Sequence, residues 1–222
     1  MANKTAESGN FDGVKLYLIT PPKIDATKFL PLLESVLATG CVSVLQLRLK
    51  NEDGSTLAST DLMPIAIKVK KICDKLETLL IINDDVEVAK AVDATGVHLG
   101  KGDVSVKKAR EILAAGKIIG ASCYDSKHLA FCAAEDGADY LAFGSFFPSN
   151  TKKITTIAKP ELLQFFCENS ALPIVAIGGI NHHNCQDILR YKPDFIATSS
   201  AIWQYEKGPE QAVKDFIFAF QK

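Results

Sequence analysis

The chain has 222 residues, of which 47% are hydrophobic and 23% charged, so it can form the core of one large domain. Its formal net charge of −1 argues against a general affinity for nucleic acid or for anionic membranes. No apolar run approaches the ~18 residues of a membrane span, and the polar start MANKTAESGNFDG has no signal-peptide core. We therefore expect a cytoplasmic protein with a flexible tail over residues 1–12 and a single domain over residues 13–222.

Short runs rich in valine and isoleucine alternate with helical patterns along the chain. The predicted strands cover residues 14–20, 42–48, 79–83, 95–100, 117–122, 139–144, 172–178 and 194–199. They are mostly apolar throughout, which is typical of parallel strands covered on both faces. Apolar residues at spacings of three and four predict helices between them, such as one over 62–76 and a last one that begins at Gly208-Pro209.

Eight strands that alternate with eight helical segments predict a single (β/α)8 TIM barrel. The alternative is a doubly wound open sheet. Such a sheet would normally use fewer strands, and the sequence has no GxGxxG turn of the kind that binds dinucleotides there.

Polar side chains, or glycines with bare backbone N–H groups, follow seven consecutive predicted strands, from the second to the eighth. In chain order they are Gln46, Arg48, Lys50, Asn83, Asp84, Asp103, Ser122, Ser149, Thr151, Lys152, Gly178, Gly179, Ser199 and Ser200. Taken singly, each has an ordinary explanation, such as a helix cap, a rim charge or a tight bend. Taken together they indicate a functional site, because the carboxyl ends of barrel strands meet at one face.

The residue types at this face are typical of a site for phosphate groups and a divalent cation. Asp84 and Asp103 follow neighbouring strands and are suited to Mg²⁺, which takes one or two protein carboxylates and completes its shell with water and phosphate oxygens. Arg48, Lys50 and Lys152 are cations for phosphate oxygens. The glycine and serine pairs after the last two strands occupy the usual phosphate site of this fold. We therefore expect two anion sites.

The segment from Gly144 to Lys159 is long for a βα connection, which typically has about 2–6 residues. It carries Ser149, Thr151 and Lys152 beside the expected phosphate sites. We interpret it as a lid whose closure excludes water from the reaction.

Seven motifs resemble those of the thiamine phosphate synthase family, in the same order and at similar spacing. They are LQLRLK, INDD, GVHLGKGD, GASCY, GSFFPSNTKK, AIGGIN and SSAI. The resemblance implies a transferase that joins hydroxymethylpyrimidine diphosphate to hydroxyethylthiazole phosphate, with Mg²⁺ assisting the dissociative departure of diphosphate. It implies small-molecule substrates, with no nucleic-acid or membrane partner, and leaves a homo-oligomer open.

The resemblance also implies a role for each matching residue. It makes Asp84 and Asp103 the Mg²⁺ ligands. The implied contacts with the pyrimidine diphosphate and the departing diphosphate come from Gln46, Arg48, Lys50, Asn83, Ser122 and Lys152. Those with the thiazole phosphate come from Ser149, Thr151, Gly179 and Ser200, and we expect Ser199, beside Ser200, to be a further substrate-binding residue. The residues implied to be catalytic are Arg48, Lys50, Ser122 and Lys152.

The chain departs from the family pattern at Leu49, Asp85, Lys101 and Tyr124. Strand alternation points Leu49 away from its polar neighbours, whereas Asp85 and Lys101 change the local charge. We expect His98, inside the fourth strand, to be a packed core residue.

These departures keep open a non-catalytic paralogue that binds a thiamine precursor. A thiazole tautomerase is a further alternative, but Tyr124 stands where that class has a histidine, and Thr151-Lys152 of the lid are present. A sugar-phosphate isomerase or epimerase barrel would share the glycine pair, yet would not need the two aspartates beside a second cationic pocket.

Overall fold

The strands of the protein form a closed parallel barrel. The computed structural model describes residues 13–148 and 157–222. Each strand pairs with the next in sequence, and β8 closes the barrel by pairing with β1. The strands are β1 (Lys15–Ile19), β2 (Val42–Leu47), β3 (Leu79–Asn83), β4 (Gly96–Leu99), β5 (Ile118–Tyr124), β6 (Tyr140–Phe143), β7 (Ile174–Ile177) and β8 (Phe195–Thr198). All eight predicted strands are confirmed, and so is the TIM-barrel fold.

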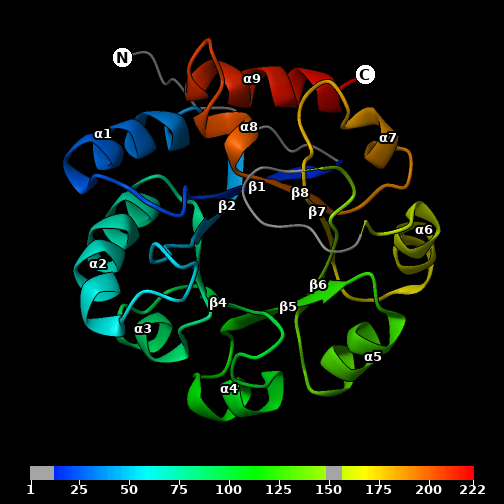
Figure 1. The fold of residues 1–222 in the computed structure, drawn as a ribbon, viewed down its shortest axis with the longest axis horizontal. Coiled ribbons are helices and arrows are strands. Elements are labelled where there is room, and N and C mark those ends of the chain that lie inside the picture. Colours follow the sequence, from blue (N-terminus) through cyan, green and yellow to red (C-terminus); the bar gives the residue numbers. More distant parts are fainter. Residues whose placement is uncertain (1–12, 149–156) are drawn as a thin grey trace, which may run out of the picture.

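The helices form a ring outside the strands (Figure 1). They are α1 (Ala26–Leu37), α2 (Ser59–Lys75), α3 (Val86–Ala91), α4 (Val106–Ile112), α5 (Lys127–Glu135), α6 (Pro160–Asn169), α7 (Gln186–Leu189), α8 (Ser200–Trp203) and α9 (Pro209–Phe220). One helix more than expected appears within the described ranges, because the segment after β8 forms the short α8 before α9. Across residues 13–148 and 157–222, no helix is both long and apolar enough to span a membrane.

The predicted tail, residues 1–12, lies outside the described residues. The same holds for residues 149–156, which contain the centre of the predicted lid. Residues Gly144–Pro148 and 157–159, at either end of that segment, form neither helix nor strand.

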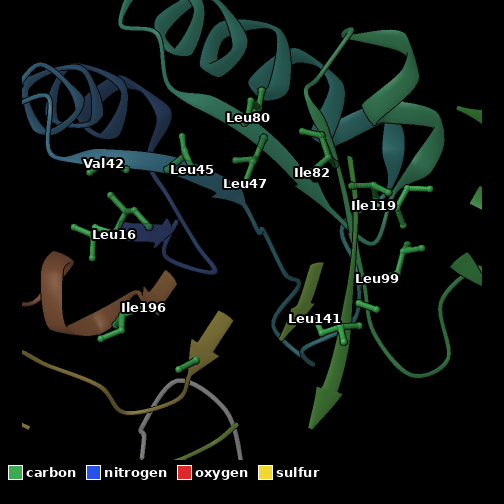
Figure 2. Packing of buried hydrophobic residues seen from close by; sticks show 14 of the residues in the cluster. Leu16, Val42, Leu45, Leu47, Leu80, Ile82, Leu99, Ile119, Leu141 and Ile196 are labelled. Atoms are coloured by element: carbon green, nitrogen blue, oxygen red, sulfur yellow. The ribbon is translucent and has the colours of Figure 1, made fainter. Parts of the chain in front are cut away.

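Two sets of buried residues arise from the alternation of side chains along each strand. One set, including Leu16, Leu45 and Leu80, packs with helix residues such as Leu33 and Phe216. Figure 2 shows members of this set from successive strands. Because their neighbours are tightly packed, truncating one of these leucines to alanine is expected to cost about 2–5 kcal/mol.

The second set lies inside the barrel and comes from the strands alone. Its members are Tyr17, Ile19, Val44, Ile81, Tyr140, Ala142, Val175 and Ala197. These residues occupy the positions between the helix-facing ones. They form the floor of the barrel interior, below the polar residues at the carboxyl ends of the strands.

Candidate active site

A cavity of about 1100 Å³ is lined by residues at the carboxyl ends of the strands. Its lining contains every predicted site residue that the structure describes: Gln46, Arg48, Lys50, Asn83, Asp84, Asp103, Ser122, Gly178, Gly179, Ser199 and Ser200. Ser149, Thr151 and Lys152 lie outside the described residues. The fold therefore brings together polar side chains that are up to 154 positions apart in sequence, from Gln46 to Ser200.

Alternation along β2 and the segment after it supplies one wall of the cavity. Gln46, Arg48 and Lys50 face the cavity, whereas Leu49 is buried in the helix-facing core, as expected. Burial lowers the pKa of Arg48, and the negative charge of Asp84 opposes that effect. Within the described ranges no side chain accepts a hydrogen bond from the Arg48 guanidinium, so its donors are available to a ligand.

The end of β3 turns sharply and directs Asp84 into the cavity. Asp84 has a positive φ of 66°, a conformation that aspartate tolerates better than most residues. Its backbone N–H donates to the carbonyl of His98 on β4, at 2.8 Å. The carboxylate then lies 2.7 Å from the Lys50 ammonium, and it also accepts a hydrogen bond from the Thr56 hydroxyl at 3.2 Å.

Asp103 reaches the same place from the segment after β4. One of its oxygens accepts a 2.7 Å hydrogen bond from the Gly100 backbone N–H, and its carboxyl group lies close enough to that of Asp84 for each to shift the pKa of the other. Burial and the contact with Asp84 raise the pKa of Asp103. Burial also opposes ionisation of Asp84, but hydrogen bonds from Lys50 and Asp103 keep the pKa of Asp84 below its usual value.

This carboxyl pair fits a hard divalent cation. Two ionised carboxylates in contact repel each other, and a cation between them removes that repulsion. The described part of the chain contains no cluster of three or more histidine, cysteine, aspartate or glutamate residues placed to hold a metal. Two carboxylates alone suit Mg²⁺, which takes its remaining ligands from water and substrate phosphates.

The neighbouring Asp85 has a structural role. Its carboxylate caps α3 by accepting from the Val88 backbone N–H at 2.8 Å, and it accepts from the Ser59 hydroxyl at 2.5 Å. Asp85 does not line the cavity, whereas Lys101 and Tyr124 do. Of the two departures expected to change the charge near the site, only Lys101 therefore lies on its wall.

The glycine and serine turns lie across the barrel from the carboxyl pair, after β7 and β8. Gly179 has a φ of 65°, and a Cβ there would lie 2.4 Å from the carbonyl oxygen of Pro148, so glycine is required. The Ser199 hydroxyl donates to the carbonyl of Thr20 at 3.3 Å and thereby ties this turn to the end of β1. Backbone groups at this turn and the Ser200 hydroxyl are suited to an anion.

Sequence reasoning missed the polar residues on the cavity floor. Tyr17 and Tyr140 come from strand interiors and line the cavity, and so does His98. His98 is buried, as expected of a core residue, but it also hydrogen-bonds Tyr140 and Ser122. The available signal was the hydroxyl and imidazole groups at inward-facing positions of otherwise apolar strands.

Comparison with known proteins shows the family of this chain. The family model described as thiamine monophosphate synthase matches residues 16–202. A thiamine-phosphate synthase of Hyphomonas neptunium is 42% identical over 93% of this chain and 94% of that protein. One of Pelagibacter ubique is also 42% identical, over 90% of this chain and 94% of that protein.

A solved structure indicates the same family as the sequence comparisons. Thiamine phosphate pyrophosphorylase from Pyrococcus furiosus superposes with a TM-score of 0.79 at 32% identity, covering 94% of this chain and 96% of that one. A 3-hexulose-6-phosphate synthase, at 14% identity and a TM-score of 0.67, shares the fold alone. The chain therefore belongs to the thiamine monophosphate synthase family.

Proposed function

We propose that this chain joins hydroxymethylpyrimidine diphosphate to hydroxyethylthiazole phosphate, forming thiamine phosphate and releasing diphosphate. Its family makes it a transferase of thiamine biosynthesis. The observation that carries the residue-level proposal is that two groups of residues suited to anions line one cavity. The carboxyl pair with Arg48 and Lys50 lies near β2–β4, and the glycine and serine turns lie near β7–β8.

Asp84 and Asp103 are the residues that would hold Mg²⁺, on the fit described above. When bound, the ion would neutralise charge on the diphosphate oxygens and so make diphosphate a better leaving group. The proposed assignment is supported by the position of both carboxyl groups on the cavity wall and by the mutual influence that raises the pKa of Asp103.

The protein side chains bind and orient the two substrates. The C–O bond between the pyrimidine methylene and diphosphate breaks, and the electron pair leaves with the diphosphate. The thiazole nitrogen then donates its lone pair to that methylene carbon. Arg48, Lys50 and Ser122 would offset the charge that develops on the leaving group, which is commonly the largest catalytic contribution of a site. No general base is needed.

The rings of the substrates need an apolar, water-poor region between the two anion sites. Ile19, Ala142, Val175, Ile177 and Ala197 line the cavity and provide it. We assign Lys152 to the departing diphosphate, and Ser149 and Thr151 to the thiazole phosphate. These three assignments rest on their motif positions in the predicted lid.

We further propose that the reaction takes place in the cytoplasm, on small-molecule substrates and without a nucleic-acid or membrane partner; a homo-oligomer stays open. The net charge of −1 supports the absence of a nucleic-acid partner. A non-catalytic paralogue and a thiazole tautomerase are less favoured, because the relatives that cover this chain almost completely are named as synthases.

The test is thiamine phosphate formation from the two precursors with Mg²⁺, comparing the native chain with Asp84→Ala and Lys152→Ala. Asp85→Ala is the matched control, since it removes an adjacent carboxylate that does not line the cavity. We expect a loss of at least about a hundredfold in the first two variants. Absence of product from folded native protein, or an unimpaired Asp84→Ala variant, would overturn the proposal.

A further inference from the structure

A continuous chain of hydrogen bonds crosses the floor of the cavity. The Gln46 side-chain amide on β2 donates to the Tyr17 hydroxyl on β1 at 2.9 Å. The hydroxyls of Tyr17 and Tyr140 lie 2.8 Å apart, and Tyr140 on β6 lies 2.9 Å from Nδ1 of His98. Nε2 of His98, on β4, is 2.8 Å from Oγ of Ser122 on β5. These hydrogen bonds thus join two predicted substrate-binding residues, Gln46 and Ser122. The three residues between them, Tyr17, Tyr140 and His98, have no assigned role.

The packing around the chain holds its members in place. Tyr17 and Tyr140 are only 2% and 7% exposed, and the Tyr140 ring stacks on His98 at a centroid distance of 5.6 Å. Burial raises the pKa of both tyrosines, so each phenol keeps its one proton at neutral pH. Gly120 makes room for the Tyr140 ring, since a Cβ there would lie 1.9 Å from Cζ of that ring.

The partners of these groups imply one direction for the donors. Tyr17 accepts from the Gln46 amide, and within the described residues the Tyr140 oxygen is the partner that can accept the buried Tyr17 proton. Tyr140 then donates to Nδ1 of His98, which makes His98 the neutral tautomer with its proton on Nε2. That N–H donates to Ser122 Oγ. The hydroxyl proton of Ser122 is therefore directed away from His98 and is free to donate elsewhere.

We propose that His98 is a positioning residue that orients the Ser122 hydroxyl, so that Ser122 acts as a donor to the phosphate oxygens of the departing diphosphate. Gln46 sets the direction of the chain through Tyr17 and Tyr140. This inference rests on the proposed function, in which Ser122 contacts diphosphate. It adds a reason why Ser122 donates there, namely that its oxygen already accepts a hydrogen bond from the buried imidazole.

A donor to a leaving group acts mainly in the transition state, where the negative charge is greatest. Its loss therefore lowers kcat with little change in KM. For Ser122→Ala we expect a fall in kcat of about a hundredfold. A residue that only orients this donor has a smaller effect, on the order of tenfold.

Two amide substitutions of His98 separate its two hydrogen bonds. The amide of His98→Gln reaches the place of Nε2 and can still donate to Ser122, whereas that of His98→Asn reaches only the place of Nδ1. We expect kcat about tenfold lower for His98→Asn and within about threefold of native for His98→Gln. A merely structural role of His98 would affect the shorter and the longer amide through packing, with no link to Ser122.

The same substitutions in a Ser122→Ala background complete a double-mutant cycle. If His98 acts through Ser122, His98→Asn lowers kcat no further there. Full additivity of the two losses, or a kcat that falls equally in the asparagine and glutamine variants, would overturn the inference. An inactive native chain would instead overturn the proposed function.

The direction of the hydrogen bonds can also be tested in the native protein by a measurement that does not depend on activity. The ¹⁵N shifts of the imidazole, assigned by their absence from His98→Gln, report which nitrogen carries the proton. We expect the Nε2–H form in native protein and a mixture of tautomers in Tyr140→Phe. If the native imidazole carries its proton on Nδ1, the hydrogen bonds run in the opposite direction and the proposal is refuted.

Discussion

A Cβ at Gly120 would collide with the Tyr140 ring on the barrel floor. In Gly120→Ala the new methyl carbon would lie 1.9 Å from Cζ and 2.3 Å from the hydroxyl oxygen of Tyr140. Carbon atoms in contact normally stay about 3.5–4.0 Å apart, so the ring must retreat by about 1.5–2 Å. The hydrogen bonds that join Tyr140 with Tyr17 and with His98, at 2.8 and 2.9 Å, cannot survive that movement.

Two costs follow from this displacement. Overpacking a well-filled core costs about 1–3 kcal/mol. Leaving a buried hydroxyl without its hydrogen bonds costs a further amount of about 1–3 kcal/mol. We therefore expect Gly120→Ala to lower the free energy of unfolding by about 2–6 kcal/mol, a large share of the about 5–15 kcal/mol typical of a folded protein.

The assay is urea denaturation followed by circular dichroism. Gly13→Ala is the matched control, because nothing lies within 4 Å of a Cβ at that position. In a Tyr140→Ala background the obstructing ring is gone, so Gly120→Ala is expected to cost less than about 1 kcal/mol there. An equal loss of stability in both backgrounds would refute the packing argument.

Three further outcomes are expected. Asp85→Ala removes the cap of α3 and should lower the free energy of unfolding by about 0.5–2 kcal/mol in urea while leaving kcat near native; a tenfold loss of kcat would contradict its structural role. Mg²⁺ binding needs both carboxylates ionised, and the raised pKa of Asp103 lets a proton compete with the metal. The Mg²⁺ affinity measured by calorimetry should therefore be constant above that pKa and fall as the pH drops through it. An affinity that rises on acidification would exclude the pair formed by Asp84 and Asp103 as the metal ligands. Gly179→Ala should raise KM for the thiazole phosphate about tenfold, because the turn cannot keep its φ of 65° beside Pro148, and an unchanged KM would place that phosphate elsewhere.

The eight strands could be predicted because each is a short apolar run and its signal is local. The walls of the cavity could be predicted almost as well. Gln46, Arg48 and Lys50 share one face through simple alternation. The rule that the carboxyl ends of barrel strands meet at one face predicted that the polar residues of the other strands lie near them. The family resemblance implied what no local pattern carries, namely which substrate each of the two expected anion sites takes.

The tertiary structure decided how neighbouring groups divide their tasks. In sequence Asp84 and Asp85 are equivalent carboxylates, and only the left-handed turn at Asp84 sends one into the cavity and the other to the start of α3. Likewise, His98 has the sequence context of a core residue, and its link to Ser122 exists because β4, β5 and β6 are neighbours in the closed barrel. Sequence periodicity determined which face each side chain takes, since that depends on local backbone geometry. Which side chains meet across the barrel depends on closure and register, which bring together residues more than a hundred positions apart, such as Tyr17 and Tyr140.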